Sequence, residues 1–282
     1  MRNQKTLAGK AKYEGIGLHS GEQTSMTFCP AEENTGIYFQ RIDLPGQPKI
    51  PALVESVFDT SRSTNIALGD AQVLTVEHVL AALRACEVDN CLIELKGIEP
   101  PVADGSSREF IRMIESCGII EQESTVSTRS LENPVYLSLG DIHLIALPSD
   151  EYRISYTLHY PETQAIKSQY ISLLINEENF KKEIADCRTF SLYHEVSYLI
   201  DKGLIKGGSL ENAVVIKDDA IMSKEGLRFF DEMVRHKVLD LIGDLSLVGF
   251  PFKAHIIAIC TGHATNVAFA KKIKNQINLE NS

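Results

Sequence analysis

The sequence contains no apolar run that approaches the roughly 18–20 residues needed to span a bilayer. The charged start at residues 1–5 is not followed by the apolar segment that a secretory signal requires. These two absences predict a cytoplasmic protein with no stable membrane insertion.

Cysteine pairs at metal-ligand or redox spacing are also missing. The six cysteines stand singly, and none forms a Cys-x-x-Cys pair. A chain of 282 residues can bury a large core without covalent staples. The pattern therefore predicts reduced thiols rather than disulfides.

Positive charge is scarce. The chain has 28 Lys and Arg against 38 Asp and Glu, which gives a formal net charge of −10. Nucleic-acid binding needs a basic face, so no nucleic-acid partner is expected. A site for an anionic ligand must instead be built from local cations or backbone donors.

The hydrophobic periodicity predicts strands followed by helices in each half of the chain, which favours an α+β fold over an alternating parallel sheet. The polar segment 121–132 separates the halves and predicts a linker. Strand patterns occupy residues 23–29, 90–96, 135–139, 143–147, 153–160, 213–216 and 252–260. Helical patterns occupy residues 74–83, 108–117, 179–187, 193–201, 227–242 and 264–276, and we expect the longest of them to end at Gly243.

The strongest candidate for chemistry is a His-x-x-x-Asp pattern in this longest predicted helix. His236 and Asp240 are four residues apart and therefore share one helix face, as metal ligands on a helix do. Asp244 continues the same face by one more turn. The alternative is an exposed polar face with no metal.

A second histidine strengthens the metal interpretation. Thr75 is a plausible N-cap, which places Glu77 and His78 in the first turn of another helix. His78, His236 and Asp240 would form the three-ligand set of a catalytic zinc. The same ligand set also accepts Fe²⁺. Glu77 would then stand where a general base for the attacking water belongs. The alternative for Glu77 is a carboxylate that complements the helix dipole.

Other candidates have weaker patterns. His263 lies among small residues between a strand and a helix, where it can approach a ligand or serve as a loop histidine. The Thr189 hydroxyl can donate to an oxyanion or cap a turn. His19 lies in a glycine-containing loop and fits a packed loop histidine. The loop 206–209 matches no phosphate-binding fingerprint.

Taken together, these segments resemble the UDP-3-O-acyl-N-acetylglucosamine deacetylase family, the zinc amidases of lipid A biosynthesis in Gram-negative bacteria. The resemblance covers nearly the whole chain. The segments that carry it are Gly15-Ile16-Gly17-Leu18-His19-Ser20-Gly21, Thr75-Val76-Glu77-His78, Pro101-Val102-Ala103-Asp104-Gly105-Ser106, Arg188-Thr189-Phe190, Gly207-Gly208-Ser209, Arg235-His236-Lys237-Val238-Leu239-Asp240-Leu241-Ile242-Gly243-Asp244 and Gly262-His263.

The resemblance implies two similar two-layer α/β-sandwich domains, packed helix layer to helix layer with the active site between them. The domains would span residues 1–125 and 126–282, with an insert at about 192–215 that forms a hydrophobic passage for an acyl chain. Apolar residues of the insert that would line this passage are Tyr193, Val196, Leu199, Ile200, Leu204 and Ile205.

The resemblance also implies a mechanism with one Zn²⁺ per chain, held by His78, His236 and Asp240. Glu77 would be the general base, and Thr189 would stabilise the oxyanion together with the metal. His263 would protonate the leaving amine, and Asp244 would orient His263 and favour its charged form.

The implied substrate is UDP-3-O-acyl-N-acetylglucosamine, which would lose its N-acetyl group as acetate. Lys237, Phe190, Tyr160 and Gly208 are the candidate substrate contacts, and we expect a monomer. Three alternatives stay open: a related zinc hydrolase for another acylated amino sugar, a non-catalytic binding protein of the same fold, and a metal-free structural protein.

Overall fold

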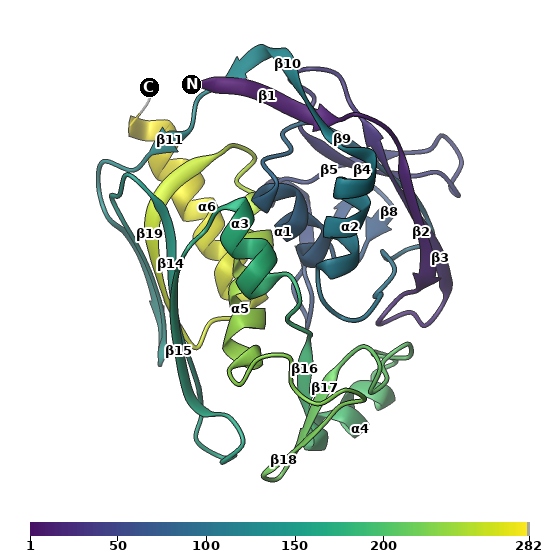
Figure 1. The fold of residues 1–282 in the computed structure, drawn as a ribbon, viewed down its shortest axis with the longest axis vertical. Helices are drawn as coiled ribbons and strands as arrows, with labels where there is room; N and C mark the ends of the chain where they lie inside the picture. Colours follow the sequence, from purple (N-terminus) through teal and green to yellow (C-terminus); the bar gives the residue numbers. More distant parts are fainter. Residues whose placement is uncertain (281–282) are drawn as a thin grey trace.

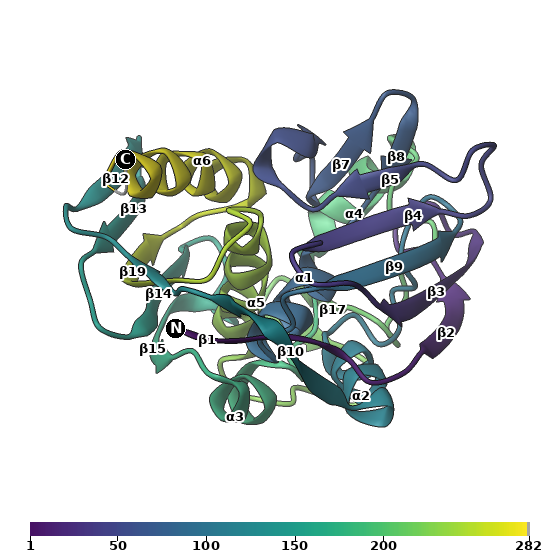
Figure 2. The same cartoon turned by 90° about the horizontal axis from the view of Figure 1, so that it is seen from above.

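The computed structural model describes residues 1–280 and shows a mixed α+β protein with two large sheets and helices between them (Figures 1 and 2). The first large sheet has the strand order β2-β3-β9-β4-β5. β4 pairs parallel with β9, and the other neighbours pair antiparallel. Its strands are β2 (Ala11–Ile16), β3 (Gln23–Pro30), β9 (Cys91–Lys96), β4 (Ile37–Arg41) and β5 (Lys49–Pro51).

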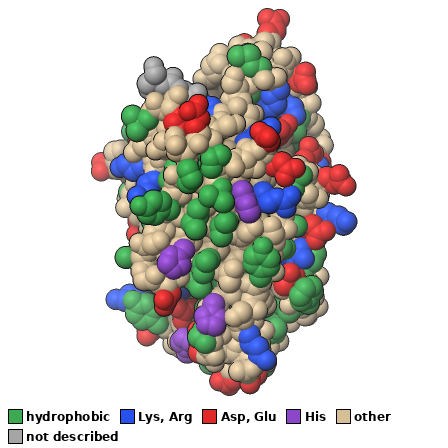
Figure 3. All heavy atoms as spheres, turned by 90° about the vertical axis from the view of Figure 1, so that its left-hand side faces the viewer, with side chains coloured by type: hydrophobic (Ala, Val, Ile, Leu, Met, Phe, Trp, Pro, Cys, Tyr) green, Lys and Arg blue, Asp and Glu red, His purple; other side chains and the backbone are tan. Residues whose placement is uncertain are grey.

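The second large sheet has the order β12-β13-β19-β14-β15, with the short β11 beside β19. Figure 3 views the molecule from the side of this sheet, where exposed apolar side chains lie among polar ones. The exposed ones on β12 and β15 include Tyr136 and Tyr170. The strands are β11 (Arg129–Ser130), β12 (Val135–Leu139), β13 (Ile142–Leu147), β14 (Tyr152–Tyr160), β15 (Lys167–Leu174) and β19 (Phe252–Ile259).

The long helices lie between the two sheets (Figure 2). α1 (Glu77–Ala85) packs against α5 (Glu232–Ser246), which in turn packs against α6 (His263–Glu280), while α2 (Arg108–Cys117) packs against α1 and β2. The contact between α1 and α5 is almost entirely buried. The core is therefore continuous from one sheet to the other, and polar residues on α1 and α5 face each other inside it.

Smaller elements flank this arrangement. Together with the 3₁₀ turn η1 (Val54–Ser56), one three-stranded sheet comprises β6 (Val57–Asp59), β7 (Asn65–Leu68) and β8 (Ala71–Val73). Another comprises β16 (Phe190–Leu192), β17 (Val214–Lys217) and β18 (Ala220–Met222), and it packs against α4 (Tyr193–Asp201). Within residues 1–280, no helix is both long and apolar enough to cross a membrane.

Most predicted strands and helices are confirmed, but the expected linker is not a loop. Residues 119–126 form β10 (Ile119–Val126), which pairs antiparallel with β1 (Arg2–Leu7). Its side chains alternate between half-buried and exposed, so the strand lies on the surface and keeps a polar sequence. Polarity alone therefore did not distinguish an edge ribbon from a linker.

Three helix predictions need correction. α5 begins at Glu232 rather than 227 and continues through Gly243 to Ser246. Gly243 does not end the helix; α1 approaches so closely that position 243 has no room for a side chain. The segment 179–187 forms only the short α3 (Glu177–Asn179) and the π-helical turn η2 (Phe180–Ile184). Thr75 is not the N-cap of α1; Val76 occupies that position, and the Thr75 hydroxyl donates to Glu99 instead.

Candidate metal centre and active site

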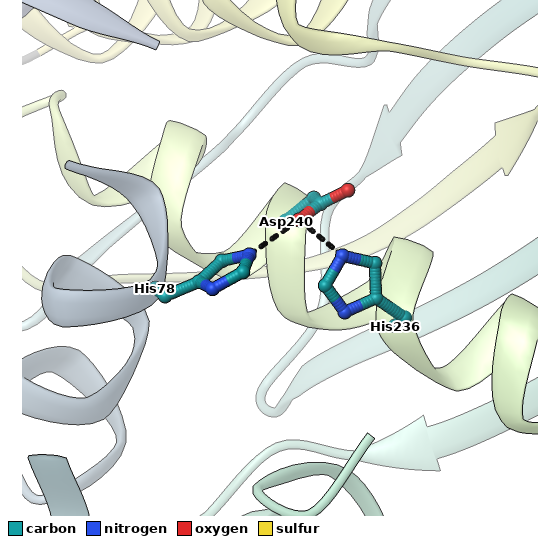
Figure 4. Close-up of side chains that lie close together, drawn as sticks. All are labelled: His78, His236 and Asp240. Carbon is teal, nitrogen blue, oxygen red and sulfur yellow. Dashed lines mark ion pairs between the residues drawn. The ribbon is translucent and has the colours of Figure 1, made fainter. Parts of the chain in front are cut away.

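Three side chains predicted as metal ligands converge where α1 meets α5 (Figure 4). His78 comes from the first turn of α1, and His236 and Asp240 come from consecutive turns of α5. The Nε2 atoms of His78 and His236 lie 3.4 and 3.2 Å from Oδ1 of Asp240. All three residues are buried, so the burial of α1 against α5 fixes the geometry.

The spacing of these atoms fits a divalent metal. Ligand atoms at zinc distances of about 2.0–2.2 Å in a tetrahedron lie roughly 3.3 Å apart, close to the measured separations. Oδ1 of Asp240 is buried and accepts no hydrogen bond within the described chain. A buried carboxylate oxygen without a donor is costly, and a cation between the two imidazoles would satisfy it.

The charges of the three residues suit metal binding. Burial would raise the pKa of Asp240, but His236 and Lys237 outweigh it and hold that pKa well below its usual range. Burial lowers the pKa of His78, which favours the neutral imidazole that a metal requires. Lys237 Nζ donates to the other Asp240 oxygen, Oδ2, at 2.9 Å and leaves Oδ1 free for a cation.

The ring of His236 is held from behind. Its Nδ1 lies 3.1 Å from the backbone carbonyl oxygen of Cys187, the kind of contact that fixes the tautomer of a metal-ligating histidine. The next residue, Arg188, is anchored to Glu232 by a buried ion pair and by its own backbone N–H. The segment that orients His236 is therefore fixed to the same helix that carries His236.

Glu77 begins α1 and points toward the same centre. Its Oε2 accepts a hydrogen bond from the backbone N–H of Thr64 at 3.0 Å, and its Oε1 lies 3.8 Å from Nε2 of His263. Burial raises the pKa of Glu77 to about 8. A carboxyl with a pKa near neutrality is suited to accept and return a proton.

His263 begins α6 and faces Glu77 from the other side. Its Nδ1 lies 3.0 Å from Oδ2 of Asp244, which also accepts a hydrogen bond from Asn266. The Thr64 hydroxyl donates to Oδ1 of Asp244. Burial would lower the pKa of His263, but Asp244 and Glu77 outweigh it and raise the pKa to about 9. Asp244 thus lies behind His263, the residue that the family resemblance pairs with it.

A cavity of about 380 Å³ opens onto these groups. The predicted substrate contacts Tyr160, Phe190 and Lys237 line it, and so does Thr189. The rings of Tyr160 and Phe190 meet edge-on at 6.0 Å, and Lys237 Nζ lies 5.6 Å from the Phe190 ring centre. Gly208 does not line this cavity; its backbone N–H closes a turn onto Ile205.

Several residues near the site were not singled out from the sequence. Arg62 and Glu195 both line the cavity and form an ion pair at 2.7 Å. Asn266 follows His263 by three residues, a helical spacing that could have revealed it. No sequence spacing points to Thr64, because it lies in the connection from β6 to β7, far in sequence from His263 and Asp244. His19, expected as a packed loop residue, is buried and also lines the cavity.

The expected hydrophobic passage has a mixed surface. Leu199 of α4 is buried, whereas Tyr193, Tyr198 and Ile200 are about half exposed. Leu192 and Glu195, at the start of α4, are the residues of this segment that reach the cavity.

Comparison with known proteins gives consistent matches. The family model described as "LpxC: UDP-3-O-acyl N-acetylglycosamine deacetylase" matches residues 4–275. The chain is 53% identical over 279 residues to the UDP-3-O-acyl-N-acetylglucosamine deacetylase of Chlamydia pneumoniae, covering 99% of both proteins. It is 52% identical over 276 residues to that of Chlamydia felis (strain Fe/C-56), covering 98% of both. The Chlamydia trachomatis serovar D protein of the same name is 50% identical over 272 residues, 96% of this chain.

Proposed function

Because the chain belongs to the UDP-3-O-acyl-N-acetylglucosamine deacetylase family, we propose that the cavity between α1 and α5 is its active site. The chain is a metal-dependent amide hydrolase of lipid A biosynthesis that removes the N-acetyl group of its substrate as acetate. The observation that carries the site assignment is the unsatisfied Asp240 Oδ1 between two buried imidazoles.

His78, His236 and Asp240 hold the metal in this proposal, with zinc favoured and Fe²⁺ possible on the same ligands. When bound, the metal polarises a carbonyl oxygen and makes a water molecule more acidic. The Asp240 carboxylate would supply one negative charge to the metal through Oδ1, while Lys237 Nζ donates to its second oxygen, Oδ2.

Glu77 accepts the proton of the attacking water. Its Oε2 is held by the Thr64 backbone N–H, and Oε1 is the oxygen that faces His263 and the cavity. Burial is the main reason why the pKa of this carboxyl is raised, and the charge of His263 works in the opposite direction. Thr189 also lines the cavity, and its hydroxyl donates to the oxyanion that develops on the amide carbonyl in this proposal.

His263 supplies the proton for the departing amine. Asp244 accepts from its Nδ1 and favours the imidazolium, so Nε2 carries the proton that the leaving nitrogen receives. Acid and base therefore lie side by side, and Thr64 links them. Its backbone N–H donates to Glu77, and its hydroxyl donates to Asp244, which in turn accepts from His263.

Lys237, Phe190 and Tyr160 are the proposed contacts for the sugar and diphosphate of the substrate. The support is their position on one side of the cavity, with the ammonium group beside two aromatic rings. Gly208 stays a candidate on the resemblance alone. A monomer and a cytoplasmic location also stay predictions.

We also infer two domains, 1–125 and 126–282, each a sheet with two helices, and an insert at about 192–215. The support is the separate pairing of β2–β5 and β9 in one sheet and of β11–β15 and β19 in the other. The packing of α1 against α5 and the position of α4 with β16 and β17 fit that division.

Acetate release from UDP-3-O-acyl-N-acetylglucosamine tests the substrate assignment. The matched comparison is the same acylated amino sugar without UDP, assayed with wild type and with Lys237→Met. We expect much slower turnover of the sugar without UDP, and a higher KM for the UDP substrate in the variant. Equal turnover of both substrates would instead favour a hydrolase for a different acylated amino sugar.

A further inference from the structure

A second cavity, of about 350 Å³, lies away from the candidate active site. Its wall combines α1, the connection into β4 and the turn that follows α5. Apolar side chains of Ile37, Leu53, Leu83 and Phe250 form much of the lining. The volume lies within the range typical of small-molecule sites.

Two charged residues line this cavity, and their partners differ. Asp89 accepts two hydrogen bonds from the Arg2 guanidinium, at 2.6 and 3.0 Å, and a third from the backbone N–H of Lys5. Its carboxylate is therefore neutralised. Arg84 has no ion-pair partner within residues 1–280, and its side chain makes one hydrogen bond, at 3.3 Å to the carbonyl oxygen of Phe252.

The Arg84 guanidinium is held in a fixed orientation. It lies 5.4 Å from the ring centre of Tyr152 and 5.8 Å from that of Phe252. Burial lowers the pKa of Arg84 and outweighs the nearby negative charges, among them Asp89, which would raise it. Arg84 lies in the wall of a cavity with both polar and apolar lining and makes a single side-chain hydrogen bond within residues 1–280, so its planar guanidinium has N–H groups left that match the two oxygens of a carboxylate.

We propose that this cavity binds a small organic monocarboxylate, with its carboxylate on Arg84 and its hydrocarbon part against Leu83, Ile37 and Phe250. One cation in the wall without an ion-pair partner favours a monoanion, because a phosphate dianion would leave a charge unbalanced. The ligand would contact α1 and, at Ser246, the C-terminal end of α5, the two helices that carry the candidate metal ligands.

Methyl NMR of the metal-loaded full chain tests the proposal, with octanoate as the probe and octanol as its uncharged counterpart. We expect octanoate to shift the Leu83 and Val88 methyl signals in a saturable way, and octanol to bind at least about tenfold more weakly. Leu83 and Val88 line this cavity and not the candidate active site. Octanoate that binds only in the active site should therefore leave these two methyl signals unshifted.

Arg84→Gln should lose this binding by at least about tenfold, while the control Arg112→Gln, on the exposed face of α2, should keep it. Unshifted Leu83 and Val88 signals would overturn the proposal, and so would equal binding of octanoate and octanol. If Arg84→Gln fails to fold, the comparison of the two probes on wild type decides the question.

Discussion

Gly243 of α5 lies directly against the backbone carbonyl of Glu77, the first residue of α1. A Cβ at position 243 would overlap with that carbonyl oxygen and with the carbonyl carbon. This contact sets the distance between the helix that carries Glu77 and His78 and the helix that carries His236 and Asp240. The glycine therefore determines the geometry of the candidate centre without touching it.

Gly243→Ala should separate the two helices and weaken both the fold and the site. We expect a loss of about 1–3 kcal/mol in the free energy of unfolding, as for overpacked cores, together with weaker metal binding. Chemical denaturation and metal titration measure the two effects. Gly9→Ala is the matched control, because a Cβ there meets its neighbours at 3.9 Å. An unchanged metal affinity in Gly243→Ala would contradict this role of the helix contact.

Loss of the metal ligands should remove the metal and the activity together. Asp240→Ala leaves two imidazoles and an unpaired Lys237 and should bind far less than one metal per chain. Chelation of wild type should abolish acetate release, and added Zn²⁺ should restore it in wild type alone. Metal analysis after gel filtration checks the stoichiometry. A full complement of metal in Asp240→Ala would remove Asp240 from the ligand set.

His263 should stabilise the metal-free protein in a pH-dependent way. Its pKa rises from 6.5 to about 9 on folding, because Asp244 and Glu77 outweigh burial. A raised pKa gives a contribution that is complete below pH 6.5 and disappears as the pH rises through 9. His263→Gln should therefore cost on the order of 3 kcal/mol at pH 6 and much less at pH 9.5.

Asp244→Asn provides the comparison for that measurement. The substitution removes the negative charge of the carboxylate that contacts Nδ1 of His263. The pKa of His263 should therefore fall in NMR titrations of the metal-free protein. Denaturation of both variants at several pH values gives the free energies. A constant cost of His263→Gln across this range would show that the imidazolium is not the stabilising species.

The buried Arg188–Glu232 ion pair should stabilise the fold and the segment at Cys187 that contacts the ring of His236. Both side chains are at most 1% exposed, and Arg188→Met would leave the Glu232 carboxylate without its cation. Removing one partner of such a pair costs about 3–5 kcal/mol. The exposed pair of Lys224 and Glu211 is the control and should have little effect. Chemical denaturation measures both effects. Equal losses in the free energy of unfolding for Arg188→Met and Lys224→Met would contradict a stabilising role of the buried pair.

The sequence predicts the parts of this protein that depend on local pattern. The period of α5 brings His236 and Asp240 to one face, and strict alternation identifies β3 and β9. The convergence of His78 on that face depends on the packing of α1 against α5, which is non-local. The sequence therefore offered the three-ligand set as a hypothesis, and the family resemblance strengthened it. The sequence assigns no role to Thr64, because its hydrogen bonds to Glu77 and Asp244 form only when a loop distant in sequence reaches α1 and α5.

For the polar segment 121–132, local pattern predicted the wrong structure. Composition predicts a linker, but β1 offers an unpaired edge from the far end of the chain, and residues 119–126 pair with it. Periodicity also did not place the ends of α5. Gly243 resembles a helix end in the sequence, but it lies inside the helix, because the need for a small residue there comes from the neighbouring α1.

The central claim is that Glu77 acts as the base beside a metal held by His78, His236 and Asp240. The most direct measurement compares wild type and Glu77→Gln for bound metal and for acetate release in the same preparations. The account predicts about one metal per chain in both, and acetate release about 10²–10⁴-fold slower in the variant. Full activity in a metal-loaded Glu77→Gln protein would contradict it, and so would a wild-type protein that hydrolyses the substrate without binding metal.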